Sequence, residues 1–263
     1  MFNLKNEEII YVQKEGIEYI QFKRLLKYGI KHAYTLKSDG INFGFEQEKN
    51  SLSYEKLCKA LDIDVKTIVQ PVQTHTDIVK CIDKVETSEN LKNVDGLITD
   101  KSQIALTTKN ADCILFIFYD PVKKVIANIH SGWRGTFQKI SEKTVKKMMN
   151  LYGSKAEDIL CFISPSIRKD HFEVDEDVKD LCRNIFEFTG KVDEFIEIGE
   201  ITNDVQKYYI DTVKINRILL ENLGLKTKNI IDCEICSACN SNKVESVRVD
   251  GELSGRATMI VTL

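Results

Sequence analysis

Three short segments of this sequence carry side chains that can hold a metal or attack a substrate. The segment QTHTD contains His75, NADC contains Cys113, and HSGWRGT contains His130. Imidazole and thiolate together form a donor set that suits zinc, and copper is the less favoured alternative. Three protein ligands leave a fourth position for water or substrate, and such an open zinc site lowers the pKa of bound water to about 7. A shared catalytic zinc site is therefore one hypothesis for these residues.

A second hypothesis needs no metal and uses two of the same side chains. Cys113 as a thiolate and His130 as a base would form the nucleophilic pair of a cysteine hydrolase. The two hypotheses compete, because a metal would occupy the sulfur that a nucleophile must keep free. The ordinary alternative for each residue is core packing, since cysteine is often a small buried hydrophobe. The wide sequence separation of the three residues, unlike that in a zinc finger, leaves all three readings open.

The surrounding sequence predicts many strands and few helices. Periodic apolar patterns predict helices at 54–61, 137–152, 176–188 and 212–223, with Asp175 and Asp211 as N-caps and Gly153 and Gly224 as C-terminal stops. Runs rich in β-branched and aromatic residues predict strands at 9–12, 17–22, 31–35, 67–72, 78–82, 104–108, 114–119, 124–130, 159–164, 229–231, 244–249 and 257–262. Without regular alternation of strand and helix, we expect an α+β fold of mixed sheets with outer helices, formed as a single domain over residues 1–263.

Composition narrows the function classes. The chain has 263 residues, 43% of them hydrophobic, and a formal net charge of −3, so it lacks the positive field that nucleic acid or an anionic membrane surface requires. Its longest apolar run, 113–119, is too short to span a membrane. The first ten residues lack the pattern of a secretory signal, and neither a GxGxxG nor a P-loop sequence occurs. We therefore expect a cytoplasmic protein that acts on a small molecule.

Several motifs occur together in the order and approximate spacing of one family. QTHTD, DGLITD at 95–100, NADC and HSGWRG resemble the signature of the YfiH-like family, whose members carry laccase-domain or polyphenol oxidase labels. The resemblance runs from about residue 33 to the end. It includes INFG at 41–44, SPSI with FEV at 164–174, and the C-terminal CSAC, SVR and SGR segments.

The resemblance implies a zinc site made by His75, Cys113 and His130, and a mixed-sheet fold similar to cysteine-dependent deamidase toxins. It also implies phosphorolysis of adenosine, inosine, guanosine and methylthioadenosine, together with deamination of adenosine. For this chemistry we assign Cys113, Asp112 and Arg134 to the catalytic set. Asp112 is predicted as the acid that protonates departing ammonia, and Arg134 as the first cation for phosphate. The substrate-binding set is Trp133, which would stack on the purine, with Arg248 and Asn42.

The sequence departs from the family pattern at several positions. Ile114 and Leu115 follow the NADC cysteine where a proline is common, and SVRV at 246–249 replaces SYRR. His171 stands where cysteine is frequent, and we expect it to cap a loop. Cys233, Cys236 and Cys239 suggest a second zinc site by their spacing, but a fourth ligand is not evident, so a packed cluster is the expectation. The four histidines, at 32, 75, 130 and 171, are too few and wrongly spaced for a multicopper oxidase.

Two other functions remain beside the zinc-dependent nucleoside enzyme. One is a Cys113/His130 hydrolase or amidase that acts on a peptide-like cell-wall precursor. The other is a metal-binding protein without catalysis. Metal dependence of turnover separates the first function from the second, and turnover itself separates both from the third.

Overall fold

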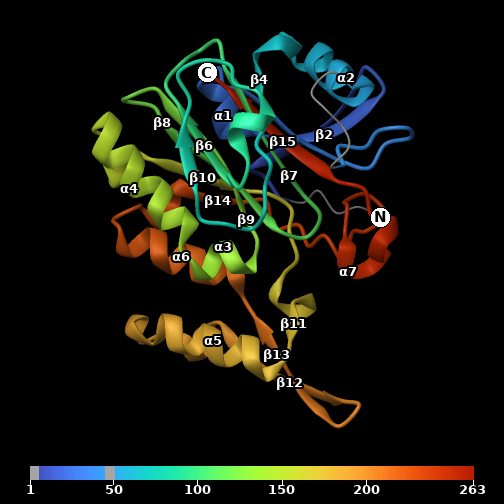
Figure 1. Cartoon of the computed structure of the whole chain (residues 1–263), viewed down its shortest axis with the longest axis vertical. Helices are drawn as coiled ribbons and strands as arrows, with labels where there is room; N and C mark the ends of the chain where they lie inside the picture. The colour runs from blue at the N-terminus through green and yellow to red at the C-terminus, as the bar shows by residue number, and fades with distance from the viewer. Residues whose placement is uncertain (1–5, 45–50) are drawn as a thin grey trace.

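The computed structural model describes residues 6–44 and 51–263, so half of the N-terminal stretch inspected for a signal lies outside it. Two six-stranded mixed sheets form the body of the molecule (Figure 1). The first sheet contains, in spatial order, β1 (Ile9–Lys14), β2 (Ile17–Phe22), β3 (Lys31–Thr35), β15 (Ala257–Thr262), β7 (Ala105–Asn110) and β4 (Ile68–Val69). The second contains β14 (Ile230–Asp232), β10 (Leu160–Ile163), β8 (Ile114–Asp120), β9 (Val125–Ser131), β6 (Gly96–Thr99) and β5 (Val79–Cys81).

Both sheets combine parallel and antiparallel neighbours, as predicted. The pairs β4–β7, β5–β6 and β10–β14 are parallel. A third, small antiparallel sheet contains β11 (Glu173–Val174), β13 (Val205–Ile210) and β12 (Ile196–Thr202). The prediction of an α+β fold with mixed sheets and outer helices is therefore confirmed.

The apolar run 113–119 became the buried strand β8, as its composition predicted. Leu115 and Ile117 belong to the core between the two large sheets, whereas Phe116 and Phe118 belong to the core on the other face of the second sheet. Because side chains alternate along a strand, β8 can serve both cores only if it is apolar throughout. The strand is therefore a rigid support for Cys113, which precedes it directly.

Seven α-helices occur in the described part of the chain: α1 (Lys23–Lys27), α2 (Leu52–Leu61), α3 (Trp133–Phe137), α4 (Ile140–Tyr152), α5 (Glu176–Phe186), α6 (Thr212–Asn222) and α7 (Val247–Asp250). The predicted stop of α4 is confirmed by Gly153, whose φ of 66° closes the helix. Asp211 caps α6, since its carboxylate accepts from the Lys214 backbone N–H at 2.8 Å. None of the helices in residues 6–44 and 51–263 has the length and apolar character needed to cross a membrane.

The structure corrects the strand expected at 244–249. Its second half is helix α7, because the Asp112 carboxylate accepts from the Arg248 backbone N–H at 2.7 Å and from the Ser246 hydroxyl at 2.7 Å. A carboxylate distant in sequence thus caps this short helix. Its hydrogen bonds outweigh the local preference of these residues for a strand.

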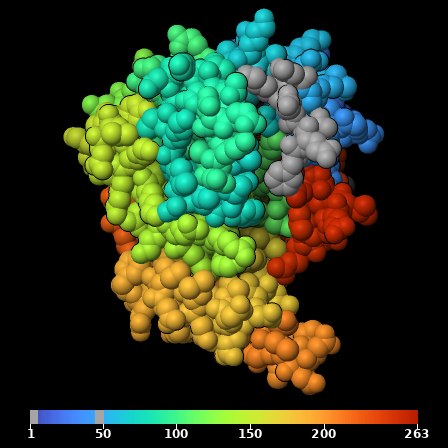
Figure 2. Space-filling model, in the orientation of Figure 1, coloured from blue at the N-terminus to red at the C-terminus, as the bar shows by residue number. Residues whose placement is uncertain are grey.

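The hairpin β12–β13 was also missed, along with β6 and β11. Its turn residues Asn203 and Asp204 have φ of 50° and 60°. Two consecutive positive φ values are typical of the tight turns that join antiparallel strands, and Asn and Asp tolerate them. The hairpin projects from the lower part of the molecule (Figure 2).

Candidate metal centre and its pocket

The loop that carries His75 joins β4 to β5 and is held by one buried carboxylate. Asp95, which is fully buried just before β6, accepts from the backbone N–H groups of Thr74 at 3.2 Å, His75 at 3.1 Å and Thr76 at 2.8 Å. His75 itself has a φ of 64°, a left-handed conformation that costs energy for a residue other than glycine. The three hydrogen bonds to Asp95 hold the loop in this shape.

Asp95 also orients the second imidazole. Its Oδ1 lies 2.7 Å from Nδ1 of His130, near the end of β9, so Nδ1–H donates to the carboxylate. This arrangement turns Nε2 of His130 away from Asp95, where it can bind a metal once its proton has left. Burial alone would lower the pKa of His130, but Cys113 and Asp95 raise it to about 9.

Cys113 completes the group from the turn between β7 and β8. Its Sγ lies 3.9 Å from Nε2 of His75, and the rings of His75 and His130 meet edge to face with centroids 4.9 Å apart. Burial alone would raise the pKa of Cys113, but His130 and His75 lower it to about 6. The sulfur is therefore a thiolate at neutral pH, the form that binds metals and attacks carbonyls.

The three side chains fit a transition metal. Their ligand atoms all lie within 4.8 Å of one another, and tetrahedral zinc with bonds of about 2.0–2.3 Å places donors about 3.3–3.8 Å apart. Gly132 makes room for them, because a Cβ there would lie 2.8 Å from Cδ2 of His75 and 3.0 Å from Sγ of Cys113. The carboxylate of Asp95 behind His130 is the outer support that metal-binding histidines commonly have. The structure thus brings together the three predicted ligands.

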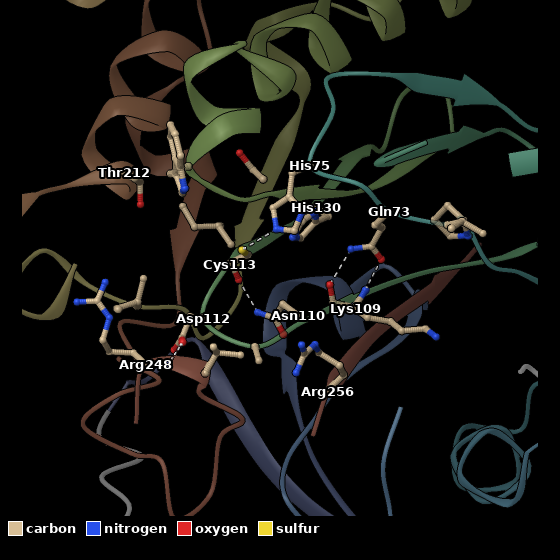
Figure 3. Close-up of a pocket in the computed structure, with 18 of the residues that line it drawn as sticks. Gln73, His75, Lys109, Asn110, Asp112, Cys113, His130, Thr212, Arg248 and Arg256 are labelled. Carbon is tan, nitrogen blue, oxygen red and sulfur yellow. Dashed lines mark hydrogen bonds between the residues drawn. The ribbon is translucent and has the colours of Figure 1, made fainter. Parts of the chain in front are cut away.

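The group opens into a pocket of about 770 Å³, a size typical of small-molecule sites (Figure 3). Among the residues that the structure describes, three cationic side chains line it, those of Lys109, Arg248 and Arg256. Burial lowers the pKa of Lys109 to about 8. Apolar surface comes from several elements, including Pro71, Ile114, Trp133, Ile167, Phe172 and Val247. The pocket therefore combines cations for an anionic group with apolar surface for a ring.

Trp133 and Asp112, both predicted for the site, line this pocket, and Asp112 makes contacts that the sequence did not indicate. Trp133 lines the pocket from the start of α3, with its ring 5.3 Å from that of Phe137. Asp112 also lines it, but its carboxylate accepts three hydrogen bonds, the two from Ser246 and Arg248 and one from Ser237 at 2.6 Å. These three donors hold the carboxylate against the C-terminal loop, so the geometry gives Asp112 a positioning role.

The other predicted cation and amide differ in their placement. Arg248 lines the pocket, whereas Arg134 is exposed and stacks its guanidinium 4.2 Å from the centre of the Trp133 ring. Successive helical residues point in directions about 100° apart, so Arg134 cannot follow Trp133 into the pocket. Asn42 does not line the pocket either; its Oδ1 accepts from the backbone N–H of Arg256 at 3.0 Å. It thereby holds the backbone of a residue that lines the pocket.

Sequence reasoning missed four residues of the site. Asp95 lies in the DGLITD motif and Arg256 in the SGR motif, so both belong to segments that resemble the family. Nothing in the sequence indicated which residues they contact. Gln73 exchanges two hydrogen bonds with the Lys109 backbone, at 2.7 and 2.8 Å, and thereby ties the His75 loop to β7. Lys109 directly precedes NADC. A cation this close to a predicted metal ligand was the signal that could have identified Lys109 as a site residue.

The C-terminal cysteines differ from the expected packed cluster. Cys233 is buried near the Arg168 guanidinium, and burial raises its pKa to about 12. Cys236 and Cys239 instead approach His171, which was expected only to cap a loop. The ligand atoms of these last three residues lie within 4.8 Å of one another.

Comparison with known proteins places this fold and site in one class. The family model described as multi-copper polyphenol oxidoreductase laccase matches residues 31–263. The structure of a protein called YfiH from Bacillus licheniformis superposes with a TM-score of 0.84 at 24% identity, covering 96% of this chain and 98% of that one. The chain therefore belongs to the YfiH-like family that its motifs predicted.

Curated relatives give the family more specific names. A protein of Clostridium acetobutylicum named purine nucleoside phosphorylase is 30% identical over 225 residues, which are 85% of this chain and 87% of the relative. A protein from an unknown prokaryotic organism named adenosine deaminase is 30% identical over 207 residues, 76% of each chain. These names differ from the laccase description of the family model.

Proposed function

We propose that this protein is a zinc-dependent purine nucleoside phosphorylase that also deaminates adenosine and phosphorolyses methylthioadenosine. The observation that carries the proposal is the His75, Cys113 and His130 group, which Asp95 supports at the wall of a pocket with three cations. The names of the relatives support the same substrate class. Zinc is favoured over copper because imidazole and thiolate donors around an open position match its usual catalytic sites.

In this proposal the cationic side chains of the pocket bind the phosphate substrate. In phosphorolysis, a phosphate oxygen attacks C1′ of the ribose while the bond to the purine nitrogen breaks and negative charge moves onto the base. Lys109, Arg248 and Arg256 line one pocket and would hold the phosphate near the sugar. We assign to these three residues the role first expected of Arg134, because Arg134 stacks on Trp133 and does not line the pocket.

The apolar side chains of the pocket bind the purine base. Trp133 and Phe172 both line it, and aromatic faces stack on purines. Asp112 holds the backbone of Arg248, and Asn42 holds that of Arg256, so both position cations. When zinc is bound by the three ligands, it supplies Lewis-acid chemistry that acidifies water and stabilises negative charge on oxygen.

Product analysis tests this function. Protein of measured zinc content is incubated with adenosine, with and without phosphate, beside a Cys113→Ala variant. Phosphate-dependent adenine and phosphate-independent inosine are expected, both lost in the variant. Methylthioadenosine with phosphate should release adenine as well. Absence of turnover by zinc-loaded protein would refute the proposal.

A second candidate function rests on a specific observation. Cys113, His130 and Asp95 form a thiolate, an imidazole and an orienting carboxylate, the order of a cysteine hydrolase triad. An amidase acting on a peptide-like cell-wall precursor would use them without metal. Two measurements test this function: whether chelation abolishes nucleoside turnover, and whether zinc protects Cys113 from a thiol reagent. If both occur, the free-thiolate mechanism is wrong.

A further inference from the structure

A second group of metal-binding side chains lies outside the site described above. His171 ends a short 3-10 helix (Lys169–His171), and Cys236 and Cys239 lie in the loop after β14. Nδ1 of His171 is 3.7 Å from Sγ of Cys236 and 3.7 Å from Sγ of Cys239. These separations match the spacing of about 3.3–3.8 Å that donors have around tetrahedral zinc.

The donor types and their order in the chain also suit a metal. Cys236 and Cys239 are separated by two residues, the spacing that lets neighbouring thiolates share one zinc ion. The imidazole comes from a segment far away in sequence, so a bound ion would add a further link between two loops that the backbone bridge from Ser166 to Cys236 already joins. Cys236 is buried and Cys239 is exposed, which leaves the group open to solvent on one side.

We infer that His171, Cys236 and Cys239 form a second site for a thiophilic divalent cation of the zinc class. Three protein donors leave one position for water. The inference does not depend on the proposed function, because none of the three residues lines the nucleoside pocket.

The loops joined by this site support the pocket. Phe172, directly after His171, lines the pocket, and Ser237, between the two cysteines, donates to Asp112 at 2.6 Å. The side chain of Arg248 in α7 donates to the carbonyl of Glu173 in β11 at 3.2 Å and so links these two elements. A metal ion here would act as a structural clip behind the Asp112 turn, away from the reacting groups.

Zinc content measured by mass spectrometry tests the second site. Metal-free, reduced protein is loaded with zinc in the presence of a competing chelator. We expect two zinc ions per chain in the wild type, one in Cys239→Ser, one in Cys113→Ala, and none in the double variant. Cys81→Ser is the matched control, since Cys81 belongs to neither group, and it should keep two. Equal zinc content in Cys239→Ser and wild type would overturn the inference.

A second measurement keeps the test independent of the folding of Cys239→Ser. Cobalt added to Cys113→Ala should give sulfur-to-cobalt charge-transfer absorption, which Cys113→Ala/Cys239→Ser should lose. Zinc should also raise the Tm of Cys113→Ala. Absence of the absorption would overturn the inference. So would a thiol count, in unfolded protein without reductant, two below the eight cysteines of the sequence, because it would show a Cys236–Cys239 disulfide instead.

Discussion

Replacing Gly132 with alanine is expected to weaken metal binding while leaving the fold intact. Gly132 has a φ of −65° and a ψ of 174°, a conformation that alanine adopts without strain. The added Cβ would nevertheless lie 2.8 Å from Cδ2 of His75 and 3.0 Å from Sγ of Cys113. The substitution therefore places one methyl group between two ligands without disturbing the backbone.

The size of the effect follows from these distances. An ordinary contact needs about 3.4 Å, so the His75 ring must retreat by about 0.6 Å, whereas metal sites tolerate about 0.2 Å in ligand distances. We expect zinc affinity to fall at least 10-fold to 100-fold, about 1.4–2.7 kcal/mol. The free energy of unfolding of the metal-free protein should change by less than about 1 kcal/mol, because alanine also lowers the entropy of the unfolded chain.

Gly135→Ala is the matched control for this experiment. It makes the same substitution three residues further along, inside α3, where the nearest atom to the added Cβ is the Thr76 carbonyl oxygen at 3.4 Å. Competitive zinc titration and nucleoside turnover should both be near wild type for this variant. Wild-type zinc affinity in Gly132→Ala, or an equal loss in Gly135→Ala, would refute the assigned geometry.

Three further predictions follow from single residues. Burial lowers the pKa of His32 from 6.5 to about 4, and its Nε2 accepts from the Phe22 N–H, so the stability contributed by the neutral ring is complete above pH 6.5 and lost as the pH falls through 4. The free energy of unfolding, measured with denaturant, should fall by about 3 kcal/mol between pH 6.5 and pH 4 in the wild type but not in His32→Gln. Equal pH dependence in the two proteins would contradict this prediction. Because the pKa of Lys109 is lowered to about 8, the KM for phosphate should rise above pH 8 in the wild type but stay high and flat in Lys109→Met; identical profiles would exclude a phosphate contact. Asp95→Asn should weaken zinc binding about 10-fold to 100-fold in competitive titration, whereas Asp77→Asn, on the loop that carries His75, should not.

The sequence by itself determined the features that depend on neighbouring residues. Alternation and apolar character identified β8 and β9, and helical periodicity identified α2, α4, α5 and α6. Short motifs were enough to predict the family and the ligands His75, Cys113 and His130, because their residue types are rare and chemically specific. These signals are local, so they can be recognised before the chain is folded.

Only the tertiary structure decided the contacts between distant segments. Asp95 reaches His130 because β6 pairs with β9, and Asp112 caps α7 because the C-terminal loop packs on its turn. Neither pairing leaves a periodic signal in the sequence. The same reason explains why the sequence grouped Cys233 with Cys236 and Cys239, whereas the structure replaces it with His171. Residue types can indicate which chemistry a chain supports, but the packing of sheets and loops decides which side chains come together in one site.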